Sequence, residues 1–331
     1  MLYLPNFFTP FYAVVNVQKD ICPRIKRGSF FKVIKMNRLE YKLMQICDRN
    51  KDGSHTTQAN RRAMLSQMTE DLKSLGYKVK DMQPSDLKGR HINALVKKWK
   101  EDGKSIGTIK NRMAVVRWWS EKIGKADMVK DNSVYGIENR VYVTNTDKSK
   151  TLKDIDLSGV SPYISQSLRL QDAFGLRREE AMKFQPVYAL DGQSIDTAKY
   201  IRLKESWAKG GRARMIPITS EKQRQELKSA LDLAKDGSLI PPEKTYKAHL
   251  ATWEKVTNAL EIGQTHGLRH GYAQTRYLEL MGFPCPAVGG YRELTEAEKI
   301  KDGEVRMQIS EELGHSRINI TSVYLGSWSK K

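Results

Sequence analysis

Between residues 56 and 124, apolar residues recur at intervals of three and four, and a glycine closes each run. This is the period of an amphipathic α-helix, because positions i, i+3, i+4 and i+7 lie on one face. The first run predicts a helix over 64–75 that ends at Gly76. Thr56 and Thr57 precede it as candidate N-caps.

Two later runs predict helices over 92–99 and 109–123, closed by Gly103 and Gly124. With a helical start near residue 37, they make a small helical domain at 37–140. Trp118 and Trp119 are expected in its core. Residues 1–36 differ, because they carry Pro, Phe and basic residues without periodicity. They are interpreted as a flexible N-terminal arm or a mis-assigned start.

Residues 141–156 are polar and basic and predict a linker. The second domain, 157–331, is expected to be mainly helical. Two short strands, Tyr200–Leu203 and Met215–Ile218, flank a glycine-bearing turn at 209–211 and predict a hairpin. The predicted fold class is therefore mainly α, with a helical domain and a mixed, mainly helical domain that holds a small antiparallel sheet.

The last third of the chain carries most of the candidate chemistry. Thr265 is a candidate N-cap for a helix that bears His266 and Arg269. Residues 283–303 are rich in Pro and Gly and predict a loop or insertion. A helix through 307–313 then ends at Gly314 and His315.

The charge balance indicates a polyanionic partner. The chain has 57 Lys and Arg against 38 Asp and Glu, a net charge of +19 at a sequence pI of about 9.7. Nucleic acid is the leading partner, and a membrane surface is second because no basic amphipathic helix stands apart. In the first domain, six cations are expected on or near exposed helix faces: Lys97, Lys98, Lys100, Lys110, Arg112 and Arg117.

Cysteine usage and hydropathy favour a cytoplasmic protein. The three cysteines, Cys22, Cys47 and Cys285, are odd in number and form no C-x-x-C motif. No apolar run is long enough to span a bilayer. We therefore expect a reduced, cytoplasmic, nucleoid-associated protein without a disulfide frame or a zinc site.

Each candidate catalytic residue is weak evidence by itself. His266 and Arg269 are three apart and share a helix face, but such pairs are common on surfaces. Lys209 on a hairpin turn is able to protonate a leaving oxygen, although most basic turns are only solvated. A free phenol has a pKa of about 10, so a tyrosine such as Tyr324 attacks a phosphate only beside cations or a base.

Together, these parts occur in one order: G-L-R-R-x-E, K-G-G-R-x-R-x-I-P, H-x-L-R-H, L-G-H-S and a final Tyr. This joint pattern over 157–326 resembles the tyrosine recombinases, the integrases of phages and mobile elements. The domain at 37–140 resembles that family's core-binding domain. The resemblance implies a C-shaped clamp on DNA and a homotetramer that exchanges strands between two duplexes at attachment sites. It also makes an accessory bending or directionality factor a candidate partner.

The resemblance also implies a role for each of six residues. Arg177 and Arg269 match the arginines that clamp the scissile phosphate, and Lys209 matches the general acid for the 5′ hydroxyl. His266 and His315 match the remaining pocket positions. Tyr324 matches the nucleophile that becomes linked to the 3′ phosphate. The covalent bond conserves energy, so no metal or nucleotide cofactor is implied.

The chain departs from the family pattern in two ways, and two alternative functions remain open. His266 and His315 are 49 residues apart, more than is usual in the family, and only seven residues follow Tyr324, which leaves open how subunits dock. The alternatives are a type IB topoisomerase and a decayed integrase that only binds DNA. The separate helical domain favours the integrase over the first, and the intact set of six residues argues against the second.

Overall fold

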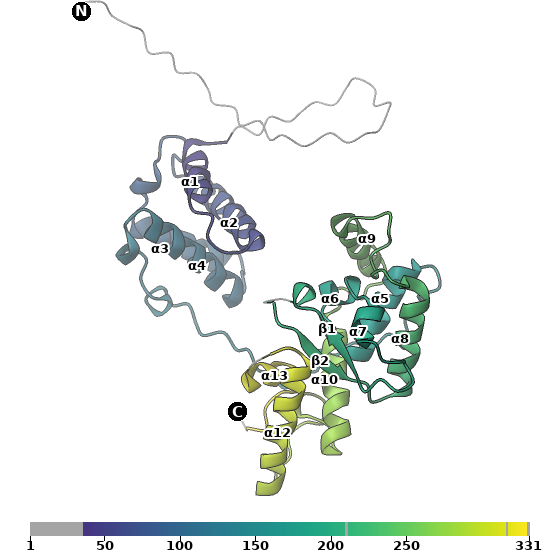
Figure 1. The fold of residues 1–331 in the computed structure, drawn as a ribbon. Coiled ribbons are helices and arrows are strands. Elements are labelled where there is room, and N and C mark those ends of the chain that lie inside the picture. The colour runs from purple at the N-terminus through teal and green to yellow at the C-terminus, as the bar shows by residue number, and fades with distance from the viewer. Residues whose placement is uncertain (1–35, 209–210, 316, 330–331) are drawn as a thin grey trace, which may run out of the picture. The chain divides into compact units, whose positions relative to one another are not determined.

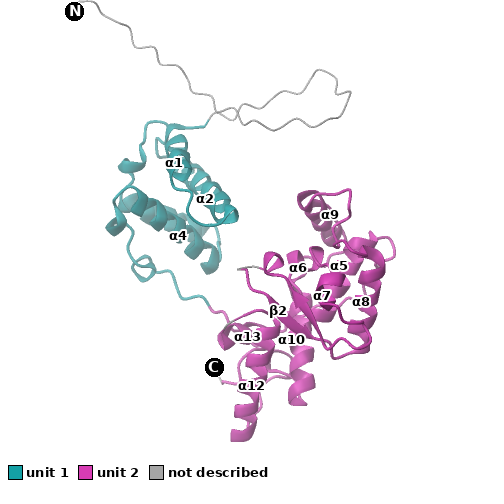
Figure 2. Cartoon of the chain, viewed as in Figure 1, with its two compact units in different colours: residues 1–140 teal, residues 141–331 magenta. Residues whose placement is uncertain are grey.

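The computed structural model describes residues 36–208, 211–315 and 317–329. The chain divides into two compact units, residues 1–140 and 141–331 (Figure 2). The expected N-terminal arm, apart from Met36, lies outside the described residues, as do Cys22 and Lys209.

The described residues of the first unit form a bundle of four α-helices (Figure 1). They are α1 Arg38–Arg49, α2 His55–Ser74, α3 Gly89–Glu101 and α4 Ile106–Lys122, with the 3₁₀ turns η1 Pro84–Asp86, η2 Ala126–Met128 and η3 Asn132–Tyr135. The predicted N-caps of α2, Thr56 and Thr57, are wrong by two and three residues. Ser54 is the N-cap, and its hydroxyl accepts from the backbone N–H of Thr57 at 3.2 Å.

Both neighbouring tryptophans lie in the core of this unit, as expected. Trp119 is 0% exposed and Trp118 is 8% exposed. Trp99 lies in the same core, and its indole N–H donates to the carboxylate of Asp71 at 2.7 Å. Arg112 also donates to that carboxylate, at 3.1 Å. A buried carboxylate therefore ties α2 to α3 and α4.

The six cations lie on or near exposed faces, as expected, since none of them is buried, but three of them also make contacts within the unit. Arg112 pairs with buried Asp71 and has a largely buried side chain. Arg117 donates to the carbonyl of Lys130, and Lys100 donates to the carbonyls of Tyr135 and Gly136. These three cations therefore contact other segments of their own unit as well as solvent.

The second unit is mainly helical around one two-stranded antiparallel sheet, so the predicted fold class is confirmed (Figure 1). In β1 Tyr200–Leu203 and β2 Arg214–Pro217, Ile201 pairs with Ile216. The second strand begins one residue earlier than predicted. The other elements are α5 Pro162–Phe174, α6 Arg178–Met182, α7 Pro186–Leu190, η4 Glu205–Trp207, α8 Glu221–Ala234, α9 Tyr246–Ala259, α10 His266–Met281, α11 Pro286–Gly289, α12 Glu296–Glu312 and α13 Ile318–Leu325.

The segment 283–303 is not the continuous loop that its composition predicted. It holds the short helix α11 and the first two turns of α12. Thr295 accepts from the N–H of Glu298, and the carboxylate of Glu298 accepts from Thr295, which makes a capping box. This cap starts the helix at Glu296, and Gly303 is tolerated inside it.

Helix α10 is the centre of the second unit. Its residues Leu268, Ala273 and Tyr277 are fully buried, and α5, α12 and α13 pack against it (Figure 1). Residues far apart in sequence therefore meet at its first turns.

Cys47 and Cys285 are buried free thiols. Among the described helices, none is both long enough and apolar enough to cross a membrane.

The carboxylate of Asp71 gives a stability prediction. Asp71→Ala should lower the free energy of unfolding by about 2–4 kcal/mol, because it leaves the Trp99 N–H and the Arg112 guanidinium buried without a partner. Urea unfolding of the full chain measures this. The exposed Asp81 of the same unit is the matched control, and equal effects of Asp71→Ala and Asp81→Ala would contradict the role of Asp71.

Candidate active site

The buried guanidinium of Arg269 is the centre of the candidate site. Arg269 is 0% exposed and lies in the first turn of α10. Its two terminal nitrogens donate to the carbonyls of Gly175 and Leu313, which are the C-caps of α5 and α12. Helix ends leave unpaired carbonyls and partial negative charge, which a cation satisfies. Burial lowers the pKa of Arg269 to about 10, so the group stays charged at neutral pH.

The phenol of Tyr324 meets this guanidinium and two imidazoles. Tyr324 lies in α13 and is 4% exposed. Its oxygen is 3.3 Å from Nε of Arg269, 3.3 Å from Nε2 of His266 and 3.4 Å from Nε2 of His315. The structure therefore brings together four of the six sequence-predicted residues around one oxygen atom.

Thr265 does not cap α10 as expected. Its backbone is already helical, at φ −63° and ψ −1°, and its side chain makes no capping hydrogen bond. The first turn of α10 is fixed instead by Arg269 and its two carbonyl acceptors.

Arg177, the fifth predicted residue, is held at the edge of the site by an ion pair with a buried carboxylate, that of Glu180. It follows Gly175, whose φ of 60° turns the chain out of α5, and it is the N-cap of α6. Gly175 has no room for a side chain, because a Cβ there would lie 2.5 Å from the Tyr272 ring. Arg177 donates to Glu180 at 2.7 Å. Its positive charge helps to lower the pKa of both His266 and His315, so it acts at the same site.

Glu180 and Arg214 were not assigned roles from the sequence, although both lie in the quoted motifs. Glu180 is 0% exposed and accepts two hydrogen bonds from Arg214, at 2.9 and 2.7 Å. Burial alone would raise the pKa of Glu180, but Arg214, Arg269 and Arg177 hold it at about 2. Glu180 is therefore a carboxylate that holds two arginines, Arg177 and Arg214, by hydrogen bonds. The G-L-R-R-x-E spacing was the available signal.

A second buried carboxylate, Glu312, fixes the end of α12. It accepts from the hydroxyl of Tyr272 at 2.8 Å and from Nε of Arg276 at 3.2 Å. Its backbone carbonyl accepts from Nε of Arg214 at 2.9 Å. These contacts place the carbonyl of Leu313 and the ring of His315 beside α10.

Both imidazoles are held in the neutral form. Desolvation, then the positive charges of Arg269 and Arg177, lowers the pKa of His315 to about 4. The same kinds of cause, led by desolvation, lower the pKa of His266 to about 4. His266 is exposed at the mouth of the site whereas His315 is half-buried, and solvent opposes such a shift. We expect the smaller shift at His266.

The described part of the chain holds no cluster of three or more His, Cys, Asp or Glu side chains suited to a metal ion. What the site does hold is fixed positive charge from Arg177, Arg269 and Arg214, a phenol, and two neutral imidazoles. This arrangement suits an anion with a reacting centre near the phenol. Lys209, the sixth predicted residue, lies outside the described residues.

Comparisons with known proteins identify two family domains. Residues 36–129 match a family described as phage integrase, N-terminal, and residues 145–275 match a family described as integrase. No curated protein sequence matches the chain.

Solved structures show the same fold at low identity. The chain is similar to the Tn1549 transposon integrase in complex with a circular intermediate DNA, at 14% identity and a TM-score of 0.52, over 88% of this chain and 96% of that one. It is also similar to a lambda integrase dimer bound to a COC′ core site, at 13% identity and a TM-score of 0.56, over 87% and 98%. The XerH recombinase bound to palindromic difH has 14% identity and a TM-score of 0.50, over 87% and 81%.

The neutral imidazoles give a titration prediction. In the DNA-free protein, His315 should titrate near pH 4 and His266 well below 6.5, as followed by NMR of the ring protons. The variants His315→Gln and His266→Gln assign the resonances. Because the unfolded chain takes up these protons as pH falls from 6.5 towards 4 and the folded chain does not, stability should be full above this window and fall within it. A pKa of 6.5 for His315 would contradict the account, in which burial and the positive charges of Arg269 and Arg177 lower the pKa of this ring.

Proposed function

Because the chain is a site-specific recombinase of the integrase type, a member of the tyrosine recombinase family, we propose that it cleaves and rejoins DNA through a covalent 3′-phosphotyrosine at Tyr324. The observation that carries this proposal is the position of the Tyr324 oxygen, within 3.3–3.4 Å of Arg269, His266 and His315. A phenol in that place faces both positive charge and proton acceptors.

In the proposed first step, the Tyr324 oxygen attacks the phosphorus of the scissile phosphate. The oxygen–phosphorus bond forms as the bond from phosphorus to the 5′ oxygen breaks. Arg177 and Arg269 stabilise the charge that develops on the non-bridging oxygens, since a guanidinium holds two oxygens and stays charged. Glu180 keeps Arg177 and Arg214 aligned.

Two protons move in this step. The phenol proton passes to a neutral imidazole, that of His266 or His315, which its lowered pKa leaves free to accept at neutral pH. The departing 5′ oxygen takes a proton from Lys209. Rejoining is the reverse reaction, in which a 5′ hydroxyl attacks the phosphotyrosine and releases Tyr324.

We further propose that the substrate is double-stranded DNA at the attachment sites of a mobile element. The net charge of +19 and the helical first unit support DNA binding. The Tn1549 transposon integrase and the lambda integrase, which have the same fold, were solved on DNA. A tetramer on two duplexes, an accessory bending or directionality factor and a nucleoid-associated, cytoplasmic location belong to the same proposal.

A type IB topoisomerase is the less favoured candidate. The match of residues 36–129 to an integrase N-terminal domain favours a recombinase. Relaxation of any supercoiled plasmid, without sequence preference, would support the topoisomerase instead.

The nucleophile is tested with a pool of nicked duplexes of random sequence. The wild-type protein should form adducts that resist SDS, and sequencing of the trapped DNA identifies the site. Tyr324→Phe should bind the recovered duplex with unchanged affinity and form no adduct, because it lacks only the attacking oxygen. Tyr200→Phe, on β1 and away from the site, is the matched control and should react normally. Persistent adducts with Tyr324→Phe would contradict the assignment.

The role of Lys209 is tested on the recovered duplex. Lys209→Ala should slow cleavage by about 10²- to 10⁴-fold, the usual effect of losing a general acid. Replacing the bridging 5′ oxygen with sulfur should restore much of that rate, since a thiolate leaves without a proton. Arg269→Ala should stay slow on both substrates. Equal defects of Lys209→Ala on the two substrates would remove the acid role.

A further inference from the structure

The chain directly after Tyr324 folds back onto its own unit. Helix α13 has only eight residues, Ile318–Leu325, so it holds the nucleophile on two turns. It ends at Gly326, whose φ is 79°. A Cβ on Gly326 would lie 2.7 Å from the side-chain oxygen of Asn145 and 2.9 Å from the backbone of Ala287. The exit of α13 is therefore a close fit between two other segments.

A buried arginine of α12 holds the first residue of this exit. Arg306 is 6% exposed and donates to the carbonyl of Gly326 at 3.0 Å. Its Nε pairs with Asp302 at 2.7 Å, one turn earlier on the same helix. The guanidinium thus connects α12 directly to the end of α13.

Trp328 makes a second anchor. Its indole N–H lies 3.1 Å from the carboxylate of Asp302 and 3.3 Å from the hydroxyl of Tyr277. Its ring packs edge-on against Phe283, with centroids 6.0 Å apart. Tyr277 is fully buried in α10, so this contact reaches the core of the unit.

Asn145 makes the third anchor from the segment that precedes the second unit's first helix. Its amide nitrogen donates to the carbonyl of Ser327, and its oxygen accepts from the N–H of Ser327, both at 2.9 Å. One side chain thereby satisfies both the N–H and the carbonyl of Ser327. Two residues later, Asp147 accepts from Gln274 at 3.0 Å, and Gln274 also donates to the carbonyl of Tyr324 at 3.4 Å.

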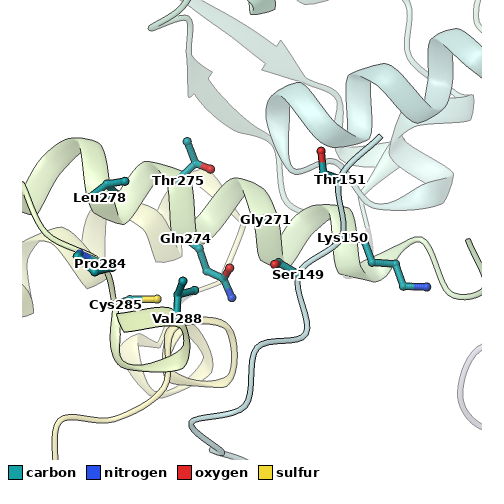
Figure 3. A pocket seen from close by; sticks show the side chains of 10 residues that line it. All are labelled: Ser149, Lys150, Thr151, Gly271, Gln274, Thr275, Leu278, Pro284, Cys285 and Val288. Atoms are coloured by element: carbon teal, nitrogen blue, oxygen red, sulfur yellow. The ribbon is translucent and has the colours of Figure 1, made fainter. Parts of the chain in front are cut away.

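The segment that carries Asn145 is itself seated on α10. Figure 3 shows the chain at Ser149 and Lys150 passing beside this helix at Gly271. The N–H of Lys150 donates to the carbonyl of Gly267 at 3.0 Å. A Cβ at Gly271 would lie 2.9 Å from the carbonyl oxygen of Lys150, so the close approach requires glycine there. The anchor at Asn145 is thus tied to the helix that holds Arg269.

We propose that Asn145, Arg306 and Trp328 are positioning residues for the nucleophile: they fix the exit of α13 to the same subunit's α10 and α12 and so hold the Tyr324 oxygen at that subunit's own cations. The role in the reaction rests on the proposed function. The three residues touch neither the phenol nor the phosphate site in any described contact. They act by restricting the local unfolding of the two-turn helix α13.

The first test needs no DNA, so its result stands even if the proposed reaction fails. Hydrogen exchange of the full-length protein is measured for Trp328→Phe, which keeps an aromatic ring but loses the N–H, and for Asn145→Ala. Amides of α13 should exchange about 10-fold faster in each variant, because one net hydrogen bond is worth roughly that factor in local opening. Amides of α10 from Arg269 onward should be unchanged. Thr146→Ala and Ser329→Ala, on exposed neighbours, are the matched controls.

The second test uses the duplex recovered from the covalent selection. At saturating protein, Trp328→Phe and Asn145→Ala should form the adduct about 10-fold more slowly, with DNA affinity within about twofold of wild type. The double variant should be slower still. Unchanged exchange in α13 would overturn the proposal, and so would faster exchange spread evenly over α10 and α13, which indicates a general loss of stability. Faster exchange in α13 with a normal adduct rate would remove the positioning role.

Discussion

The second unit depends on a buried positive charge. Moving a guanidinium out of water is costly unless every donor finds an acceptor. Arg269 meets this requirement with the C-terminal carbonyls of two helices and with the phenol of Tyr324. The same contacts that make its burial tolerable bring α5, α10, α12 and α13 to one point. The contacts that satisfy the buried guanidinium therefore both stabilise the fold and assemble the site.

Around this charge, the site carries more positive than negative groups. Glu180 joins Arg177 and Arg214, and its carboxylate is held ionised with a pKa of about 2. Arg269 has no carboxylate among its hydrogen-bond partners in the described residues. An anion completes such a site. A phosphodiester fits because it brings charge and a reactive phosphorus atom to the oxygen of Tyr324.

Periodicity and turn residues predicted most of the fold. Helices over 64–75, 92–99 and 109–123 and the two strands of the small sheet left strong local signals in the sequence. The start of α12 was missed because Pro and Gly in 283–303 suggested a loop, while the Thr295 capping box decided the outcome. Caps and glycines can be recognised in the sequence. Where two such local signals conflict, the contacts of the folded protein decide which one prevails.

The sequence likewise predicted only part of the site. His266, Arg269, His315 and Tyr324 were recognised through a joint motif, and the structure gathers them. Glu180, Glu312 and the anchors of Gly326 were not given roles. They act through buried polar contacts between distant segments, such as Asn145 with Ser327, and such pairs have no period that a single sequence displays.

The most direct test of the central claim is to identify the covalent bond itself. The trapped adduct is digested with nuclease and protease, and the peptide is sequenced by mass spectrometry. The account predicts a nucleotide phosphate on Tyr324, joined through the 3′ end, with a free 5′ hydroxyl on the other DNA fragment. A phosphate on any other residue, or a link through the 5′ end, would contradict it.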